Sequence, residues 1–143
     1  MTFEQAFTLD VPSTTQNLAL IRDFVNRISA QAGFDVDEMA KLELAVDEAC
    51  ANVIEHAYGN EQGKQVIVRA SFDDEVLRIT VVDTGKGFDP AKIHQADLRE
   101  LVGKRRTGGL GLRLIQSLMD EVHYEIGPGH KNEMTMVKRL RKP

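Results

Sequence analysis

The sequence has little of what several classes of protein require. Its 143 residues contain one cysteine, Cys50, which excludes an internal disulfide and any metal site built from cysteine pairs. The net charge of −4 argues against general nucleic-acid binding, which leaves a basic footprint. No apolar run approaches the length of a membrane span, and no basic segment followed by an apolar one opens the chain. We therefore expect a cytoplasmic protein that binds neither nucleic acid directly nor a membrane.

The composition is that of one soluble domain. Hydrophobic residues make up 42% of the chain and charged residues 28%, and 143 residues are enough for a substantial core. No linker, internal repeat or low-complexity segment divides the chain. We therefore expect a single domain spanning residues 1–143.

The hydrophobic pattern predicts elements in the order β-α-α-β-β-α-β-β. Helices interrupt the strands too rarely for repeated βαβ units, so we expect an α+β fold. It should be a two-layer sandwich, in which a mixed, mostly antiparallel sheet carries helices packed on one face. The expected strands cover residues 7–11, 66–72, 76–82, 122–126 and 133–140. The expected helices run from residue 13 or 14 to 33, from 35 or 37 to about 58–60, and from 112 to 119.

Residue types at the helix ends support these limits. Ser13 or Thr14 is expected to cap the first helix and Gly33 to end it, and Asp35 or Asp37 is expected to cap the second. Residues 90–106 are polar and weakly periodic, which favours a mobile segment with a short helix. The basic run at residues 138–142 is interpreted as a solvated strand end.

Two glycine-rich segments are typical of a nucleotide site. The apolar strand that ends at Asp83 runs into Gly85 and Gly87, so a carboxylate able to accept from an exocyclic amine stands beside backbone that can approach a ligand closely. Residues 108–112, Gly-Gly-Leu-Gly-Leu, precede an apolar helical pattern. A helix start presents free N–H groups and a positive dipole end, which suit phosphate.

A third element lies on the second helix. Glu48 and Asn52 are four residues apart and share a helix face. The amide oxygen of Asn52 suits a Mg²⁺ ion that keeps several waters and binds triphosphate oxygens. The Glu48 carboxylate could orient water or accept a proton from a hydroxyl. A solvated polar face would explain this pair alone, but the two glycine segments that follow it favour a site.

Together the three motifs resemble those of the GHKL ATPase superfamily, which includes gyrase, histidine-kinase and MutL ATPases and shares the Bergerat fold. A threonine beside the adenine pocket of that superfamily corresponds to Thr135. Residues 48–58 are most similar to the anti-sigma-factor serine kinases of bacterial partner-switching systems. Gly108-Gly109 departs slightly from relatives that have one small residue and one glycine. The matching motifs are Glu48-x-x-x-Asn52, Asp83-x-Gly85-x-Gly87-Phe88 and Gly109-Leu110-Gly111-Leu112.

The resemblance implies a role for each position. Asp83 would bind the adenine amino group with Thr135 nearby, and Asn52 would hold Mg²⁺ against the phosphates of ATP. Glu48 would be the general base for a serine hydroxyl. Arg105, within the basic trio at 104–106, would reach the γ-phosphate, although that trio also fits a solvated basic turn. The remaining positions would let backbone meet the base or the phosphates: Gly85, Gly87, Gly108, Gly109, Leu110, Gly111 and Leu112.

Two functions fit these expectations. The first is a serine kinase that phosphorylates an anti-anti-sigma partner of the STAS type and, in its other state, sequesters a sigma factor, as a homodimer. The second is a non-catalytic, nucleotide-gated switch that sequesters or activates a regulatory protein. Glu48 favours the kinase, because holding ATP does not require it. A P-loop or conventional protein kinase is set aside, since neither G-x-x-x-x-G-K-[ST] nor H-R-D occurs.

Overall fold

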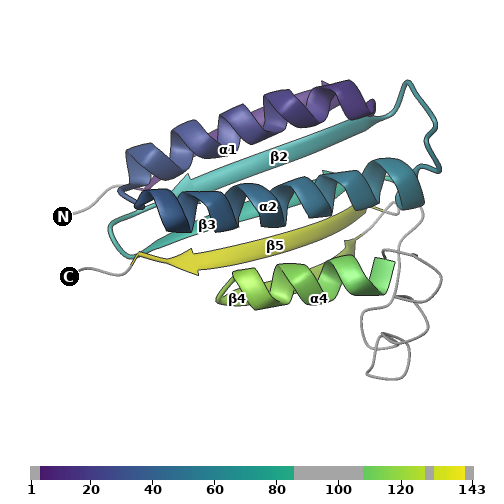
Figure 1. The fold of residues 1–143 in the computed structure, drawn as a ribbon. Coiled ribbons are helices and arrows are strands. Elements are labelled where there is room, and N and C mark those ends of the chain that lie inside the picture. Colours follow the sequence, from purple (N-terminus) through teal and green to yellow (C-terminus); the bar gives the residue numbers. More distant parts are fainter. Residues whose placement is uncertain (1–3, 86–107, 128–130, 141–143) are drawn as a thin grey trace.

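The computed structural model describes residues 4–85, 108–127 and 131–140, and these form a sheet with helices on one face (Figure 1). The observed order of strands and helices is the expected one, and the α+β class is confirmed. The elements are β1 (Gln5–Pro12), the 3₁₀ turn η1 (Thr15–Asn17), α1 (Leu18–Ala32), α2 (Val36–Asn52), the π-helical turn η2 (Val53–Ala57), β2 (Gln65–Phe72), β3 (Val76–Asp83), α4 (Gly108–Leu118), β4 (Glu121–Gly127) and β5 (Lys131–Arg139).

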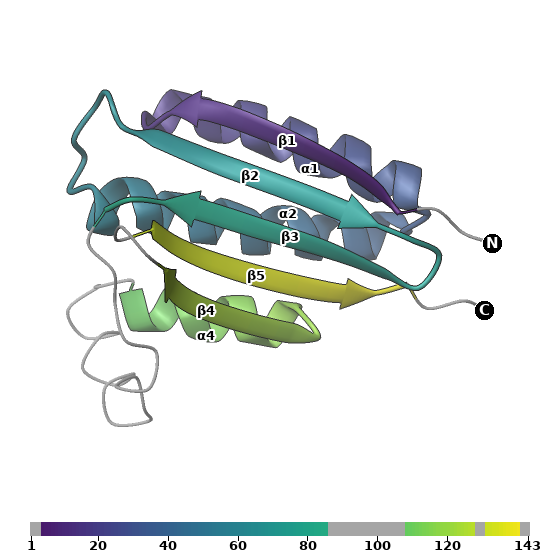
Figure 2. The same ribbon diagram turned by 180° about the vertical axis from the view of Figure 1, so that it is seen from behind.

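The sheet has five strands in the order β1-β2-β3-β5-β4. Each of its four pairings is antiparallel, so in the described residues the sheet is antiparallel rather than mixed. The helices α1, α2 and α4 lie side by side on one face of the sheet (Figure 1). The view turned by 180° shows the other face, the open face, which none of these helices covers (Figure 2). Because α2 packs against both α1 and α4, its residues reach both neighbouring helices.

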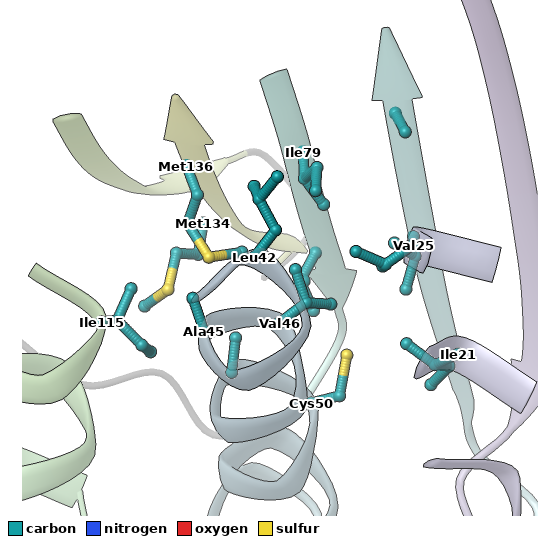
Figure 3. Packing of buried hydrophobic residues seen from close by; sticks show 14 of the residues in the cluster. Ile21, Val25, Leu42, Ala45, Val46, Cys50, Ile79, Ile115, Met134 and Met136 are labelled. Atoms are coloured by element: carbon teal, nitrogen blue, oxygen red, sulfur yellow. The ribbon is translucent and has the colours of Figure 1, made fainter. Parts of the chain in front are cut away.

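The core fills the space between the sheet and these helices (Figure 3). Alternate strand residues such as Ile79 and Met136 point toward the helices, and α2 places Leu42 and Val46 among them. This is the period-2 and period-3.6 patterning of a sheet and helices that share one core. Cys50 is fully buried, as expected, and burial raises the pKa of its thiol. The core therefore holds α2 firmly in the middle of the helical layer.

Two of the predicted helix ends are confirmed. The Asp35 carboxylate accepts a hydrogen bond from the Glu38 N–H at 2.8 Å, and Gly33 ends α1 with a φ of 105°. The predicted cap on the first helix is wrong. Thr14 precedes the 3₁₀ turn and its side chain makes no capping hydrogen bond. Ser13 is buried, and its hydroxyl donates to the Glu61 carbonyl instead, so a tertiary contact replaces the local one.

Lys138 is buried, which corrects the interpretation of this basic run as a solvated strand end. Its Nζ donates to the carbonyl of Leu118, the last residue of α4, at 2.8 Å. The same Nζ lies 2.9 Å from the buried Oε2 of Glu38 in the first turn of α2, as an ion pair rather than an aligned hydrogen bond. Lys138 thus ties α2, α4 and β5 together at one end of the domain.

Replacing Lys138 by methionine should lower the free energy of unfolding by about 3 kcal/mol, because the Glu38 carboxylate would lose its buried cation. Urea denaturation measures this loss. Lys41→Met is the matched control, since Lys41 pairs with the same carboxylate at 3.6 Å from a half-exposed position. That change should stay within about 0.5 kcal/mol. Equal losses in the two variants would contradict a special role for Lys138.

Candidate functional site

Gly111 lies directly against Glu48 and Asn52, where α4 packs on α2. A methyl group on Gly111 would stand 2.6 Å from Asn52 Nδ2 and 3.0 Å from Glu48 Oε2. Real Cβ atoms do not come within 2.6 Å of another heavy atom, so any larger residue would displace the Asn52 side chain from this position. The first and third sequence motifs therefore meet, although Asn52 and Gly111 are 59 positions apart in the sequence.

The glycine segment forms the first turn of α4. The helix begins at Gly108, four residues before the predicted start at Leu112. The first four N–H groups of a helix have no partner within it, and here they belong to residues 108–111. They stand at the end of α4 that abuts Glu48 and Asn52. An anion would therefore meet backbone donors and the positive end of the helix dipole at this point.

Asp83 ends β3 with a buried, oriented carboxylate. The side chain is 5% exposed, and its Oδ1 accepts hydrogen bonds from the Gly85 N–H and from Asn132 Nδ2, both at 2.9 Å. Burial raises the pKa of Asp83, and the hydrogen bonds from Asn132 and Gly85 oppose that rise. No hydrogen bond from a described residue reaches Oδ2, so this oxygen can accept from a ligand.

The end of α2 is fastened to the end of β3. The Tyr58 hydroxyl accepts from the Thr84 N–H at 3.0 Å and donates to the Gln65 carbonyl at 2.6 Å. A methyl group on Gly85 would stand only 2.5 Å from the Ala57 carbonyl oxygen, so the chain after Asp83 rests on the π-helical turn η2. The C-terminal ends of α2 and β3 and the start of α4 consequently gather at one side of the domain (Figure 1).

The pKa of Glu48 is raised. Partial burial is the largest cause, followed by the negative charges of Asp47 and Glu55. Asp47 is itself paired with Arg22 of α1, whose Nη1 lies 2.7 Å from Asp47 Oδ1. A glutamate that binds a proton more readily than usual is better matched to take one from a hydroxyl near neutral pH.

Thr135 does not lie beside Asp83, which corrects the expectation for this residue. Its Oγ1 is 3.0 Å from Thr80 Oγ1, its partner across β3 and β5. Side chains alternate along a strand, and Asp83 points to the helical face with Ile79 whereas Thr80 points to the open face. The residue opposite Asp83 is Asn132, whose side chain reaches it.

The other predicted positions are placed only in part. Gly87 and Arg105 lie outside the described residues, and Gly108, Gly109 and Leu110 are described as backbone of the first turn of α4. The Leu112 side chain is buried in the core, so only its backbone could serve a ligand. Neither Asn132 nor Tyr58 was predicted from the sequence as a site residue. Asn132 lies two and four residues before the core residues Met134 and Met136, and this period-2 spacing would have placed it on the helical face.

A cavity of about 300 Å³ lies beside the same strand ends, but on the open side of the sheet. Ile67 and Val82 line it and are cross-strand partners on that face, and Asp83, Lys64 and Lys131 also line it. Neither Glu48 nor Asn52 is among its lining residues. It is therefore separate from the contact between α2 and α4.

In the described chain, no helix combines the length and apolar character that crossing a membrane requires.

This fold and this arrangement of side chains define a histidine kinase-like ATPase domain. The model of that family matches residues 11–138, and the chain belongs to the family. Within it, the chain belongs with the serine-protein kinases called RsbW. The RsbW of Bacillus subtilis is 33% identical over 132 residues, 89% of this chain and 82% of that protein. The RsbW of Bacillus licheniformis is 36% identical over 131 residues, 87% of this chain and 80% of that protein.

A solved structure has the same fold. The crystal structure of the RsbU and RsbW domains of a Mycobacterium tuberculosis protein aligns with a TM-score of 0.70 and 20% identity. The alignment covers 97% of this chain and 33% of the longer Mycobacterium tuberculosis chain. At this identity the likeness supports the fold alone. Membership of the family makes this chain an ATP-dependent protein kinase.

Proposed function

We propose that the protein is an anti-sigma factor and serine kinase of a partner-switching system. It binds Mg·ATP, phosphorylates a serine on an anti-anti-sigma protein of the STAS type, and sequesters a sigma factor. The observation that carries the proposal is the contact of Gly111 with Glu48 and Asn52. That contact brings the Asn52 amide, the Glu48 carboxylate and the free N–H groups of a helix start into one place.

ATP is bound at its two ends by separate groups. Oδ2 of Asp83 accepts a hydrogen bond from the adenine amino group, and Gly85 lets backbone approach the base. The N–H groups of residues 108–111 receive the phosphates. By resemblance to the superfamily, Gly87 is assigned to the part of the site that binds the base, and Arg105 to the part that binds the γ-phosphate.

Asn52 holds Mg²⁺ through its amide oxygen. One neutral protein oxygen beside a carboxylate fits this ion, since Mg²⁺ usually keeps several waters and takes its other ligands from phosphates. When bound, Mg²⁺ neutralises charge on the triphosphate. The position of Asn52 against Gly111 supports the assignment, because it places the amide beside the expected phosphates.

Glu48 accepts the proton of the serine hydroxyl as the serine oxygen attacks the γ-phosphorus. The bond from the γ-phosphorus to the bridging oxygen breaks, ADP leaves, and phosphoserine remains. Most of the acceleration comes from positioning and charge neutralisation, with Glu48 adding proton transfer. Its raised pKa supports this role.

The partners follow from the same assignment. The substrate is the STAS-type protein and the sequestered protein is a sigma factor, so we place the kinase in the cytoplasm, where a sigma factor acts. We propose that residues 1–143 form one domain and that it works as a homodimer.

The purified protein should transfer labelled γ-phosphate from Mg·ATP to one small protein in host lysate, on serine. Asn52→Ala should bind Mg·ATP more weakly by about tenfold or more and label less, because the metal loses its protein ligand. Calorimetry measures that affinity. Absence of any labelled protein, with Mg·ATP binding confirmed on the same preparation, would instead support a nucleotide-gated binding switch without transfer.

A further inference from the structure

We propose that Asn132 is a positioning residue that makes the nucleotide site select adenine over purines with a C6 keto group. It does so by fixing the orientation of the Asp83 carboxylate. The inference rests on the proposed function, since it concerns the same nucleotide site. It adds a residue that the sequence motifs do not contain.

Asn132 is buried, and its amide nitrogen binds two acceptors. Its side chain is 1% exposed, and Nδ2 donates to Asp83 Oδ1 at 2.9 Å and to the Gly85 carbonyl at 3.0 Å. Both partners are acceptors, so the amide nitrogen rather than the oxygen must face them, and both of its hydrogens are used. One side chain therefore connects the carboxylate with the backbone that follows it.

Two donors on Oδ1 fix how the carboxylate is turned. The Gly85 N–H and Asn132 both bind this oxygen, so rotation of the carboxylate would break one buried and one partly buried hydrogen bond. Oδ2 is then held in one direction as an acceptor. An adenine amino group can donate to it, whereas the C6 keto oxygen of hypoxanthine or guanine would face it as a second acceptor.

Loss of Asn132 should weaken this selection in two ways. The carboxylate could turn, so that no oxygen would stay fixed in the direction in which Oδ2 now accepts. Its pKa would also rise further, because burial raises it and the Asn132 hydrogen bond opposes the rise. A protonated carboxyl group can donate to a keto oxygen, so a larger protonated share of Asp83 would weaken the rejection of the keto purine.

Asparagine suits this position better than a residue with a single donor hydrogen. A threonine hydroxyl has one hydrogen to donate, whereas the Asn132 amide binds Asp83 and Gly85 at once. The cross-strand register supports the assignment, since Asn132 is the Cα partner of Asp83.

The test compares the Kd values of ATP and inosine triphosphate, each with Mg²⁺, by calorimetry. The two nucleotides differ at C6, where one carries an amino group and the other a keto oxygen. Wild type should prefer ATP, and Asn132→Leu should reduce the ratio of the two affinities by about tenfold or more. Thr80→Val is the matched control, because it removes a hydroxyl on the open face of the strand that carries Asp83. Its ratio should equal that of wild type.

A ratio unchanged in Asn132→Leu would overturn the inference. Should that variant fail to fold in a thermal melt, Asn132→Ser decides the question in the same way, since serine keeps one donor at most. A wild type that prefers ATP together with an unchanged variant rejects the role of Asn132 alone. A wild type that binds neither nucleotide rejects the nucleotide site itself, and the inference with it.

Discussion

Glu48→Gln is expected to reduce phosphoryl transfer by about 10²–10⁴-fold while leaving Mg·ATP affinity nearly unchanged. Glutamine has almost the shape of glutamate but cannot accept the serine proton. The packing of Glu48 against Gly111 should survive, because the carboxylate oxygen that faces the glycine is replaced by an atom of similar size. Transfer is measured with labelled ATP and the purified partner, and affinity by calorimetry.

The pH dependence of the rate should identify the same group. A base must be deprotonated to act, so the rate rises with pH through the pKa of Glu48. Since burial and Asp47 raise that pKa, the acid limb should lie above the usual range of glutamate. Asp47→Asn should move the limb to lower pH, because one of the charges that raises the pKa is removed. The residual rate of Glu48→Gln should lack the limb.

Glu43→Gln is the control for a charge change on the same helix. Glu43 accepts a hydrogen bond from Asn26 of α1, and glutamine can keep that bond. Its transfer rate and pH profile should match those of wild type. Full activity in Glu48→Gln would remove Glu48 from the role of base and leave positioning as the whole of the mechanism.

Local features of the fold could be predicted from the sequence because their causes are local. Asp35 caps α2 through its own side chain, and Gly33 ends α1 because its φ of 105° suits glycine. The strands followed from alternation, since one face of the sheet meets the core. The three motifs were identified by residue type, and the family they indicated is confirmed.

What the sequence could not provide was contact between distant segments. The apolar pattern predicted a helix from Leu112, yet α4 begins at Gly108 and includes the glycines in its first turn, where it packs on α2. The low helix propensity of glycine gives no sign of this extension. The register of the strands explains the other differences between the predicted and the observed positions. A strand residue changes face with each step, and this parity turns Thr135 away from Asp83 and Asn132 toward it. Lys138 was misjudged for the same reason, since its parity points it at the helices.

Gly111→Ala should separate the stability of α4 from the function of the site. Alanine favours a helix over glycine by about 1 kcal/mol, so urea denaturation should show little loss of stability. The added methyl group would stand 2.6 Å from Asn52 Nδ2 and 3.0 Å from Glu48 Oε2, and both side chains would have to move. A displacement of about 1 Å in a reacting group can reduce the rate about 100-fold, and we expect a loss of this size in transfer.

The same substitution should weaken Mg·ATP binding, because Asn52 would no longer stand where the phosphates meet the helix start. Gln116→Ala is the control, since it adds alanine to an exposed position of α4 and should change neither property. Calorimetry and labelled transfer, read beside denaturation, distinguish the cases. If Gly111→Ala kept wild-type affinity and rate, the close contact between α2 and α4 would not be the arrangement in which ATP is used. A stable variant that loses both would show that the glycine is retained for the site, against the preference of the helix that contains it.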